Sequence, residues 1–295
     1  MKSLRIISVL IFFMFTPSIF ANQLLVDANW LVKHKNDKNV VVVDMSSDYT
    51  QHQRFHIPGA VYLPYSEINQ TSKQRISYAV SPQLLQRNLG ALGINQDTHI
   101  VIYDDMGGLN ASRLFWQLEQ IGHKKVSILD GGLVSWIRKG LPITGQVVQP
   151  KPASYTAKKV NMDNLASMQD VLKASKGNSI TLVDARSTEE YLGHPRYKRS
   201  GHIPGAISYS WDNSVDFNKA FMLKSKKQIK SLLKQAGLKS DKNKPIIAYC
   251  RSGHRAAHAY FNLRLLGYKN IKLYDGSIAE YERQVSAPLK TGKQP

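Results

Sequence analysis

Short runs of apolar, often β-branched residues alternate along the chain with longer segments in which apolar residues recur every three or four positions. The apolar runs cover residues 40–44, 99–104, 126–130, 180–185, 245–250 and 271–275. Continuous runs of this length are typical of strands buried in a parallel sheet. The amphipathic segments, each followed by a glycine that can end a helix, are 81–92, 110–121, 226–236 and 254–266. This alternation predicts an α/β fold with mainly parallel sheets flanked by helices.

The two halves of the chain repeat the same landmarks in the same order. His-Ile-Pro-Gly-Ala occurs at residues 56–60 and again at 202–206, each time after a Val-Asp pair. Tyr103 and Tyr249 follow the glycine of that motif at the same distance. A period of about 145 residues is too long for a solenoid repeat and therefore predicts two duplicated domains.

Proline-rich and targeting segments complete the predicted organisation. Lys2 and Arg5 precede an apolar stretch at 6–15, and a small residue, Ala21, follows a helix-breaking proline, as in a cleavable signal peptide. The stretch is shorter than the ~20 residues that span a bilayer. We expect cleavage after Ala21, export to a periplasm or the exterior, and no integral membrane anchor. The predicted segments are a signal peptide at 1–21, a first domain at 22–145, a linker at 146–157 and a second domain at 158–295.

The net charge of +19 calls for an anionic partner or substrate. Lysines and arginines are scattered along the chain, and the densest run, at 224–234, has the spacing of a solvated helix face. A nucleic-acid binder would gather its cations with interleaved aromatics on one surface, so we exclude nucleic acid. An anionic membrane surface or a small anionic substrate remains.

The chain has a single cysteine, Cys250. One thiol excludes an intramolecular disulfide and any multi-cysteine metal cage. In an oxidising compartment a lone cysteine is either a buried inert side chain or a reactive one. His254 and His258 have the spacing to bind a metal with Cys250, but no further ligand cluster is visible, so we predict no metal.

The sequence around Cys250 favours the reactive interpretation. Cys250 ends a predicted strand, and the next residues lead into a predicted helix, so its sulfur should face the N–H groups of a helix N-terminus. Arg251 and Arg255 add positive potential, and His254 is a further candidate. Such surroundings should populate the thiolate.

A thiolate in this position can carry sulfur. It can attack the outer sulfur of a donor anion, hold that sulfur as a persulfide and pass it to a thiophilic acceptor. The loop, Ser252 and Gly253 included, would stabilise the terminal sulfur as an oxyanion hole stabilises oxygen. This cycle needs no cofactor.

The duplicated unit resembles the rhodanese family over nearly the whole mature chain. The resemblance lies in the Val-Asp strand end with His-Ile-Pro-Gly-Ala, in Cys-Arg-Ser-Gly-His-Arg after a strand, and in Asp-Gly before a tryptophan or tyrosine. Two-domain members are thiosulfate and mercaptopyruvate sulfurtransferases whose first domain has lost its cysteine. Asp104 stands here where Cys250 stands in the second half. The resemblance therefore implies a sulfurtransferase with its catalytic cysteine in the second domain.

Cysteine-dependent phosphatases use a similar loop and offer an alternative function. Their loops keep five residues between cysteine and arginine, whereas four residues separate Cys250 from Arg255. The tighter loop favours a sulfur atom over a tetrahedral phosphate.

The choice of donor rests on arginines. Mercaptopyruvate enzymes of the family carry small uncharged loop residues, so the two loop arginines favour thiosulfate. The resemblance also implies donor-binding arginines before the second His-Ile-Pro-Gly: Arg186 matches a family position, and Arg196 and Arg199 fall in the same insert. Glu190 stands where mercaptopyruvate enzymes commonly have an arginine. We therefore expect a thiosulfate sulfurtransferase; the alternatives are a 3-mercaptopyruvate sulfurtransferase and a non-catalytic sulfane-sulfur carrier.

Four duplicated residues have an expected structural role. Asp44 and Asp184 should tie strand ends to neighbouring loops, and His56 and His202 should be hydrogen-bonded turn residues, since both halves keep them.

Overall fold

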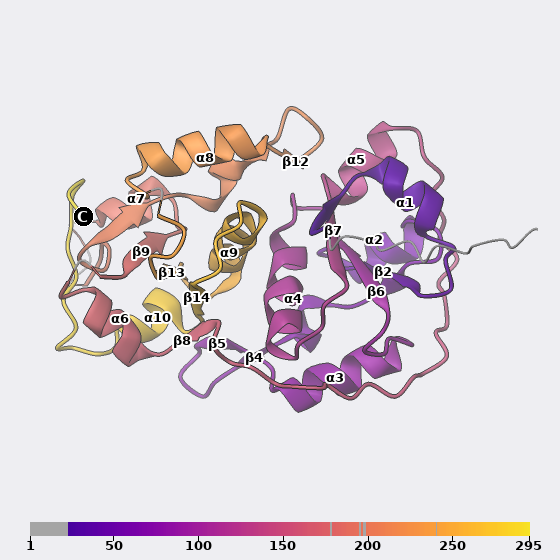
Figure 1. The fold of residues 1–295 in the computed structure, drawn as a ribbon, viewed down its shortest axis with the longest axis horizontal. Helices are drawn as coiled ribbons and strands as arrows, with labels where there is room; N and C mark the ends of the chain where they lie inside the picture. The colour runs from indigo at the N-terminus through magenta and orange to yellow at the C-terminus, as the bar shows by residue number, and fades with distance from the viewer. Residues whose placement is uncertain (1–22, 178, 195, 197–198, 240) are drawn as a thin grey trace, which may run out of the picture.

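Two similar α/β domains lie side by side in the computed structural model, which describes residues 23–177, 179–194, 196, 199–239 and 241–295 (Figure 1). The predicted signal peptide at 1–21 lies outside these residues. Across the part of the chain that is described, no helix combines the length and apolarity needed to cross a bilayer.

Each domain contains a five-stranded parallel sheet. The first has the order β1 (Leu25–Val26), β7 (Val126–Leu129), β6 (His99–Tyr103), β2 (Val40–Asp44) and β3 (Val61–Tyr62). The second has the equivalent order β8 (Leu165–Ala166), β14 (Ile271–Tyr274), β13 (Ile246–Tyr249), β9 (Thr181–Asp184) and β10 (Ala206–Ser208). The predicted α/β class, the parallel strands and the duplication are confirmed.

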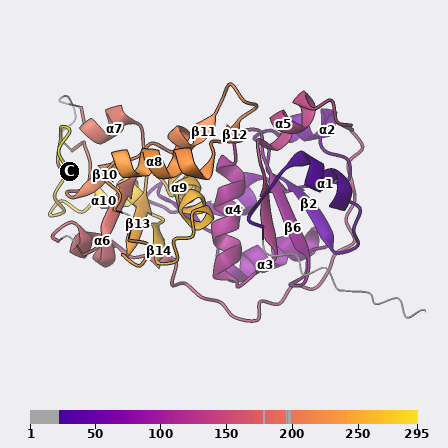
Figure 2. The same cartoon turned by 45° about the horizontal axis from the view of Figure 1, so that its top comes forward.

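Helices pack on both faces of each sheet, as parallel strands require (Figure 2). Those of the first domain are α1 (Ala28–His34), α2 (Tyr49–Arg54), α3 (Pro82–Ala91), α4 (Leu109–Gln120) and α5 (Gly132–Arg138). Those of the second are α6 (Met168–Ala174), α7 (Thr188–Leu192), α8 (Lys226–Gln235), α9 (His254–Leu265) and α10 (Ser277–Tyr281). All four predicted helices form, and no end differs from the prediction by more than one residue. Serine capping explains the starts of two of them, because Ser81 and Ser225 accept backbone N–H bonds at the N-termini of α3 and α8.

The predicted roles of the duplicated Asp and His residues are confirmed. Asp44 accepts hydrogen bonds from the Ser46 backbone and from His52, and Asp184 accepts from Arg186. His56 and His202 contact the carbonyl oxygens of His52 and Tyr191. In the first domain His52 links Asp44 to His56, and in the second Arg186 links Asp184 to the Gly201 carbonyl, next to His202 in the chain.

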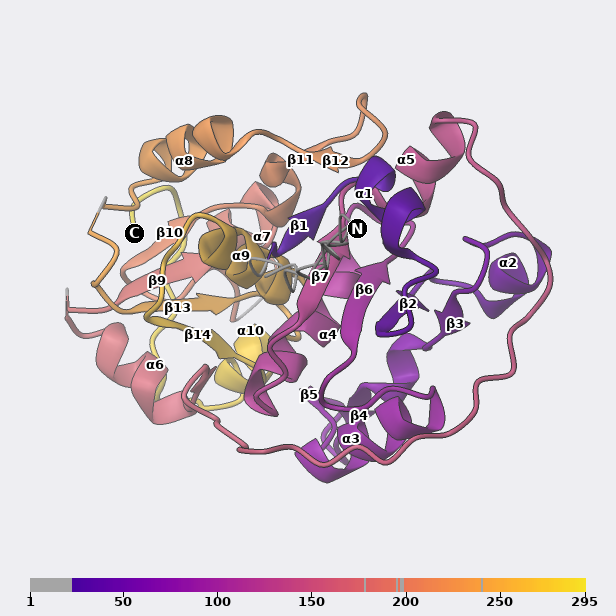
Figure 3. The same cartoon turned by 45° about the vertical axis from the view of Figure 1, so that its right-hand side comes forward.

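The two domains pack through α4 and α9, which lie next to each other in the middle of the molecule (Figures 1 and 3). Phe115 of α4 and Phe261 of α9 meet edge to face, with ring centroids 5.0 Å apart. Both belong to one apolar core that continues from domain to domain. Since the two helices start at the ends of equivalent strands, this packing brings the Asp104 loop and the Cys250 loop to the interface.

Each domain also extends a hairpin toward the loops of the other. In the first domain it is β4 (Asn69–Thr71) and β5 (Ser77–Ala79), preceded by the short 3-10 helix η1 (Tyr65–Glu67). In the second it is β11 (Val215–Asp216) and β12 (Met222–Leu223), preceded by η2 (Trp211–Ser214). The Ala79 N–H donates to Asp275 at 2.7 Å, and the Leu223 N–H donates to Asp130 at 2.8 Å. The aspartate before α5 or α10 thus accepts a bond from the hairpin of the other domain.

Candidate active site

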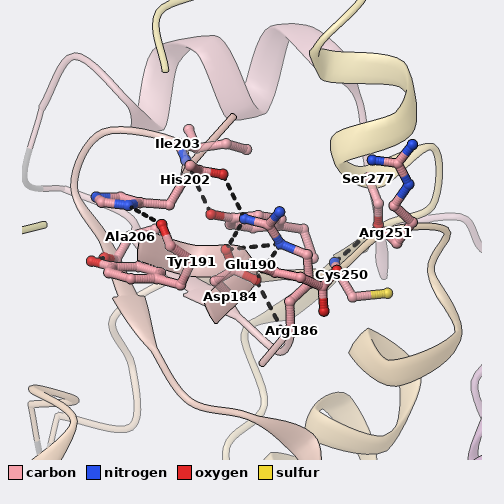
Figure 4. A network of polar contacts seen from close by, with 12 residues as sticks. Asp184, Arg186, Glu190, Tyr191, His202, Ile203, Ala206, Cys250, Arg251 and Ser277 are labelled. Atoms are coloured by element: carbon pink, nitrogen blue, oxygen red, sulfur yellow. Dashed lines mark hydrogen bonds and ion pairs between the residues drawn. The ribbon is translucent and has the colours of Figure 1, made fainter. Parts of the chain in front are cut away.

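Cys250 follows β13 directly and begins a short loop that ends at Gly253, the residue before α9. The loop is held from one side by Ser277, the first residue of α10. Its Oγ accepts the N–H groups of Cys250 and Gly253, both at 3.1 Å, and donates to the Tyr274 carbonyl at 2.8 Å. Figure 4 shows the first of these contacts, with the sulfur of Cys250 directed away from Asp184.

The next residues of α10 hold the carbonyl side of the same loop. The N–H groups of Ile278 and Ala279 donate to the carbonyl oxygens of Cys250 and Arg251, both at 3.1 Å. These two carbonyl oxygens are bound by α10, whereas some N–H groups of the loop are available to another acceptor. Those of Ser252 and His254 have no hydrogen-bond partner among the described residues.

The equivalent loop of the first domain shows what such N–H groups bind. The buried carboxylate of Asp104 accepts from the N–H groups of Met106, Gly108 and Ala111, at 2.9, 2.9 and 3.0 Å. Burial raises the pKa of Asp104, although the three N–H donors oppose this shift. The loop after β6 is therefore an anion cradle that its own side chain fills. In the second domain a cysteine stands at the corresponding position, and its side chain is almost fully buried, with 1% exposed.

Both predicted loop arginines have carboxylate partners. Arg251 lies at the surface, with 56% of its side chain exposed, and contacts Glu282 at 3.2 and 3.4 Å. Arg255 donates to both carboxylate oxygens of Glu190, at 2.5 and 3.0 Å. Burial alone would raise the pKa of Glu190, but the hydrogen bonds and charge of Arg255 outweigh burial and hold that pKa below its ordinary value. The loop therefore carries less net positive charge than the two arginines alone indicate.

The expectation that His254 adds positive charge is wrong. Burial, together with the charges of Arg113 and Arg255, lowers the pKa of His254 to about 3, so its ring is neutral near pH 7. The Asn110 amide donates to the Met45 carbonyl at 2.8 Å, which turns its oxygen toward His254 Nε2, also at 2.8 Å. The Nε2 atom is therefore the protonated one.

His258 does not join Cys250 and His254 in a metal-ligand set. Its Nε2 donates to the Gly107 carbonyl of the first domain at 3.1 Å. Within the described residues, no three His, Cys, Asp or Glu side chains gather as metal ligands would.

The three predicted donor-binding arginines of the insert differ in their surroundings. Arg186 is buried, with 4% exposed, and donates to the Asp184 carboxylate (Figure 4). It also donates to the Gly201 carbonyl. Arg199 donates to four main-chain carbonyl oxygens of the segment after α10. Arg196 is exposed. Arg186 and Arg199, but not Arg196, line a cavity of about 720 Å³ that also includes Arg251 and Glu190.

Several residues that shape the loop have no signal in the sequence. Ser277 lies at the second Asp-Gly motif, but its two bonds to the cysteine loop depend on the positive φ of 51° there. Asn110 and Arg113 lie in the other domain. Their contacts with the loop exist because α4 and α9 pack together, which the pattern of either helix alone does not indicate.

Comparison with known proteins shows which family the chain belongs to. A model of the Rhodanese-like domain matches the chain twice, at residues 27–139 and 167–284. The chain belongs to the rhodanese family. Its two copies of the family domain agree with the two sheets.

Relatives of this rhodanese span nearly its whole length. A protein of Mycobacterium bovis named "Putative thiosulfate sulfurtransferase 1" is 34% identical, covering 92% of this chain and 98% of the relative. The sulfur carrier protein TtuD of Thermus thermophilus is 33% identical, with the same coverage of each chain. The crystal structure of SseA from Escherichia coli, described as a 3-mercaptopyruvate sulfotransferase, aligns with a TM-score of 0.75 and 30% identity, covering 86% of this chain and 98% of SseA. The chain is thus a two-domain member of the rhodanese family.

Proposed function

We propose that this rhodanese transfers a sulfane sulfur from thiosulfate to a thiophilic acceptor such as cyanide, with Cys250 as the sulfur carrier. The observation that carries the proposal is the pairing of Cys250 with free loop N–H groups. In the sister loop, the N–H groups of Met106, Gly108 and Ala111 bind the Asp104 carboxylate. A persulfide anion on Cys250 would find similar donors in the N–H groups of Ser252 and His254.

The proposed cycle has two displacement steps. In the first, the Cys250 thiolate attacks the outer sulfur of thiosulfate, a sulfur–sulfur bond forms, and sulfite leaves with the electron pair of the broken bond. In the second, cyanide attacks the terminal sulfur of the persulfide, thiocyanate leaves, and the thiolate is restored. Charge balances in both steps, and no oxidant or reductant is consumed.

Arg251 is the proposed first contact for the donor. Its side chain is exposed and lines the 720 Å³ cavity, and its ion pair with Glu282 is long and open to solvent. Such pairs hold their partners weakly, so a dianion can displace the glutamate. Arg186 and Arg199 line the same cavity and are proposed to add positive potential there; Arg196 remains a candidate from its place in the insert.

Turnover of thiosulfate with cyanide tests the enzyme proposal. The purified protein should release thiocyanate, and the Cys250→Ser variant should release it only at the uncatalysed rate. Equal rates for the two proteins would overturn the proposal.

Two relatives motivate alternatives that the same material can separate. SseA motivates 3-mercaptopyruvate as the donor, and TtuD motivates a carrier that holds sulfur without turnover. A donor panel should give a higher kcat/KM with thiosulfate than with 3-mercaptopyruvate, and the opposite order would favour the first alternative. A stable persulfide on Cys250 without thiocyanate release would favour the second.

We also propose that the chain is exported and cut after Ala21. The support is the order of charged, apolar and small residues at 1–21. N-terminal sequencing of the protein recovered from a periplasmic fraction should start at Asn22. An intact N-terminus in the cytoplasmic fraction would contradict export.

A further inference from the structure

We propose that Arg113, in the domain without the cysteine, is a positioning residue for the Cys250 loop. The inference rests on the proposed role of Cys250 as sulfur carrier and assigns the first domain a part in that role. It starts from the burial of the Arg113 side chain, which is 0% exposed although a guanidinium is costly to remove from water.

The contacts of Arg113 leave its charge only partly satisfied. Its Nε donates to the Asn69 side chain at 3.1 Å, and its Nη2 lies 2.6 Å from Asp275 Oδ1. That ion pair lies outside hydrogen-bond geometry, and neither terminal nitrogen has a hydrogen-bond partner among the described residues. Nη2 nevertheless has an ionic partner, and the guanidinium also lies 4.8 Å from the Trp116 ring centroid. The buried Nη1, in contrast, has no hydrogen-bond partner among the described residues. Burying such a group costs free energy, which points to a role in the site beside it.

The guanidinium lies directly against the cysteine loop. Gly253 has a φ of +76°, and a Cβ atom built there would lie 2.5 Å from Asp275 Oδ1 and 2.8 Å from Arg113 Nη1. The loop backbone therefore rests on the Arg113–Asp275 pair. The other oxygen of Asp275 accepts the Ala79 N–H at 2.7 Å, so the first domain holds this support from two directions.

A comparison of Arg113 with the residue at the equivalent position of α9, His258, supports the positioning role. Helices α4 and α9 both contain 12 residues and follow a glycine with positive φ, Gly108 and Gly253. Arg113 and His258 each lie five positions after that glycine. His258 reaches across to the Asp104 loop as Arg113 reaches to the Cys250 loop, and its Nε2 lies 3.8 Å from a Cβ built at Gly108.

His258 and Arg113 differ in charge, and the loops that they face differ in chemistry. Burial lowers the pKa of His258 to about 4, so a neutral ring faces the loop whose anion, Asp104, is already bound. A permanent cation faces the loop in which a persulfide anion must form and leave. Arg113 keeps that loop in the shape of an anion cradle while no anion is bound, so little reorganisation is needed when charge appears.

Four proteins test the proposal: wild type, Arg113→Met, the double variant Arg113→Met/Asp275→Asn, and His258→Gln as the matched control on the opposite loop. Removing only the arginine leaves Asp275 buried without its cation, so that variant should lose stability as well as activity. The double variant removes both charges and should regain most of the thermal stability. A positioning role predicts that it does not regain turnover: kcat/KM for thiosulfate should stay about 10- to 100-fold below wild type, as expected for a misplaced reacting group.

Alkylation of Cys250 by iodoacetamide provides a readout that does not depend on sulfurtransferase activity. At pH 7 it should be slower in the double variant than in wild type, and unchanged in His258→Gln. Recovery of both turnover and alkylation in the double variant would reduce Arg113 to a structural charge and overturn the inference. If wild-type protein does not turn over thiosulfate, the proposed function fails, while the alkylation rates still decide whether Arg113 positions the loop.

Discussion

At the scale of single residues, the three arginines around Cys250 differ in how far their ion pairs with carboxylates are exposed to solvent. The three pairs are Arg251 with Glu282, Arg255 with Glu190, and Arg113 with Asp275. The side chain of Arg251 is 56% exposed and that of Arg113 is 0% exposed. Because solvent screens the outer pair and not the inner one, Arg251 can exchange its glutamate for a substrate anion, whereas Arg113 stays in place.

The pH dependence of stability tests the ion pair between Glu190 and Arg255. Arg255 lowers the native pKa of Glu190 below the ordinary glutamate value, so the pair contributes stability above the ordinary pKa and loses it as pH falls through the lower native value. Glu190→Gln keeps the side-chain shape that caps α7 and removes the charge. We expect the variant to lose about 1 kcal/mol or less of unfolding free energy at pH 7, and the difference to shrink toward pH 3.

Urea unfolding at the two pH values measures that difference. Glu189→Gln, at the exposed neighbouring position, is the control and should match wild type at both. A gap between Glu190→Gln and wild type that is as large at pH 3 as at pH 7 would rule out the assigned charge pairing.

At the scale of elements, the cysteine loop depends on a glycine for two separate reasons. The φ of Gly253 is positive, and the space beside its Cα is filled by Asp275 and Arg113. Gly205 has a similar φ of +80° but nothing within 4 Å of a built Cβ. Alanine at Gly205 therefore tests the effect of the positive φ alone, whereas alanine at Gly253 tests that effect together with a steric clash.

Alanine at these two positions should give different outcomes. Gly205→Ala should lose about 1 kcal/mol from the strained φ alone, with turnover close to wild type. Gly253→Ala carries the same strain and must also displace the Arg113–Asp275 pair, so its turnover should fall at least tenfold, on the order expected for a misplaced catalytic loop. Thermal unfolding and thiocyanate release measure the two effects, and equal turnover in both variants would contradict the close packing.

Strands and helices long enough to show a periodic pattern of apolar residues could be predicted from the sequence. Short elements whose formation depends on tertiary contacts could not. The central strands and the four long helices carry uninterrupted apolar or amphipathic patterns. The hairpin strands β11 and β12 have two residues each, which is too short for any period. At the site, Cys250 and its arginines stand together in the chain. Glu190 and Arg113 reach the loop from distant segments, so their effect on its charge appears only once the chain is folded.

At the scale of the molecule, the two domains share one apolar core. The apolar core runs through the α4 and α9 contact without interruption, and each domain's hairpin bonds an aspartate of the other. The domain without the cysteine thus helps to support the cysteine loop of the other domain. It does more than cover the site, which the duplication alone could not show.

Such an interface predicts one cooperative unfolding transition. Separating the domains would expose the core around Phe115 and Phe261 to water, so neither should stay folded when the other melts. Differential scanning calorimetry should show a single peak whose calorimetric and van't Hoff enthalpies agree. Two resolved peaks would contradict a shared core.

The mass of the protein after exposure to thiosulfate tests the central claim most directly. The account predicts an adduct of about 32 Da, one sulfur atom, on wild-type protein. The adduct should map to Cys250, be absent from Cys250→Ser, and disappear on addition of cyanide as thiocyanate is released. An unmodified Cys250 after thiosulfate treatment, or an adduct of the same mass on the serine variant, would contradict it.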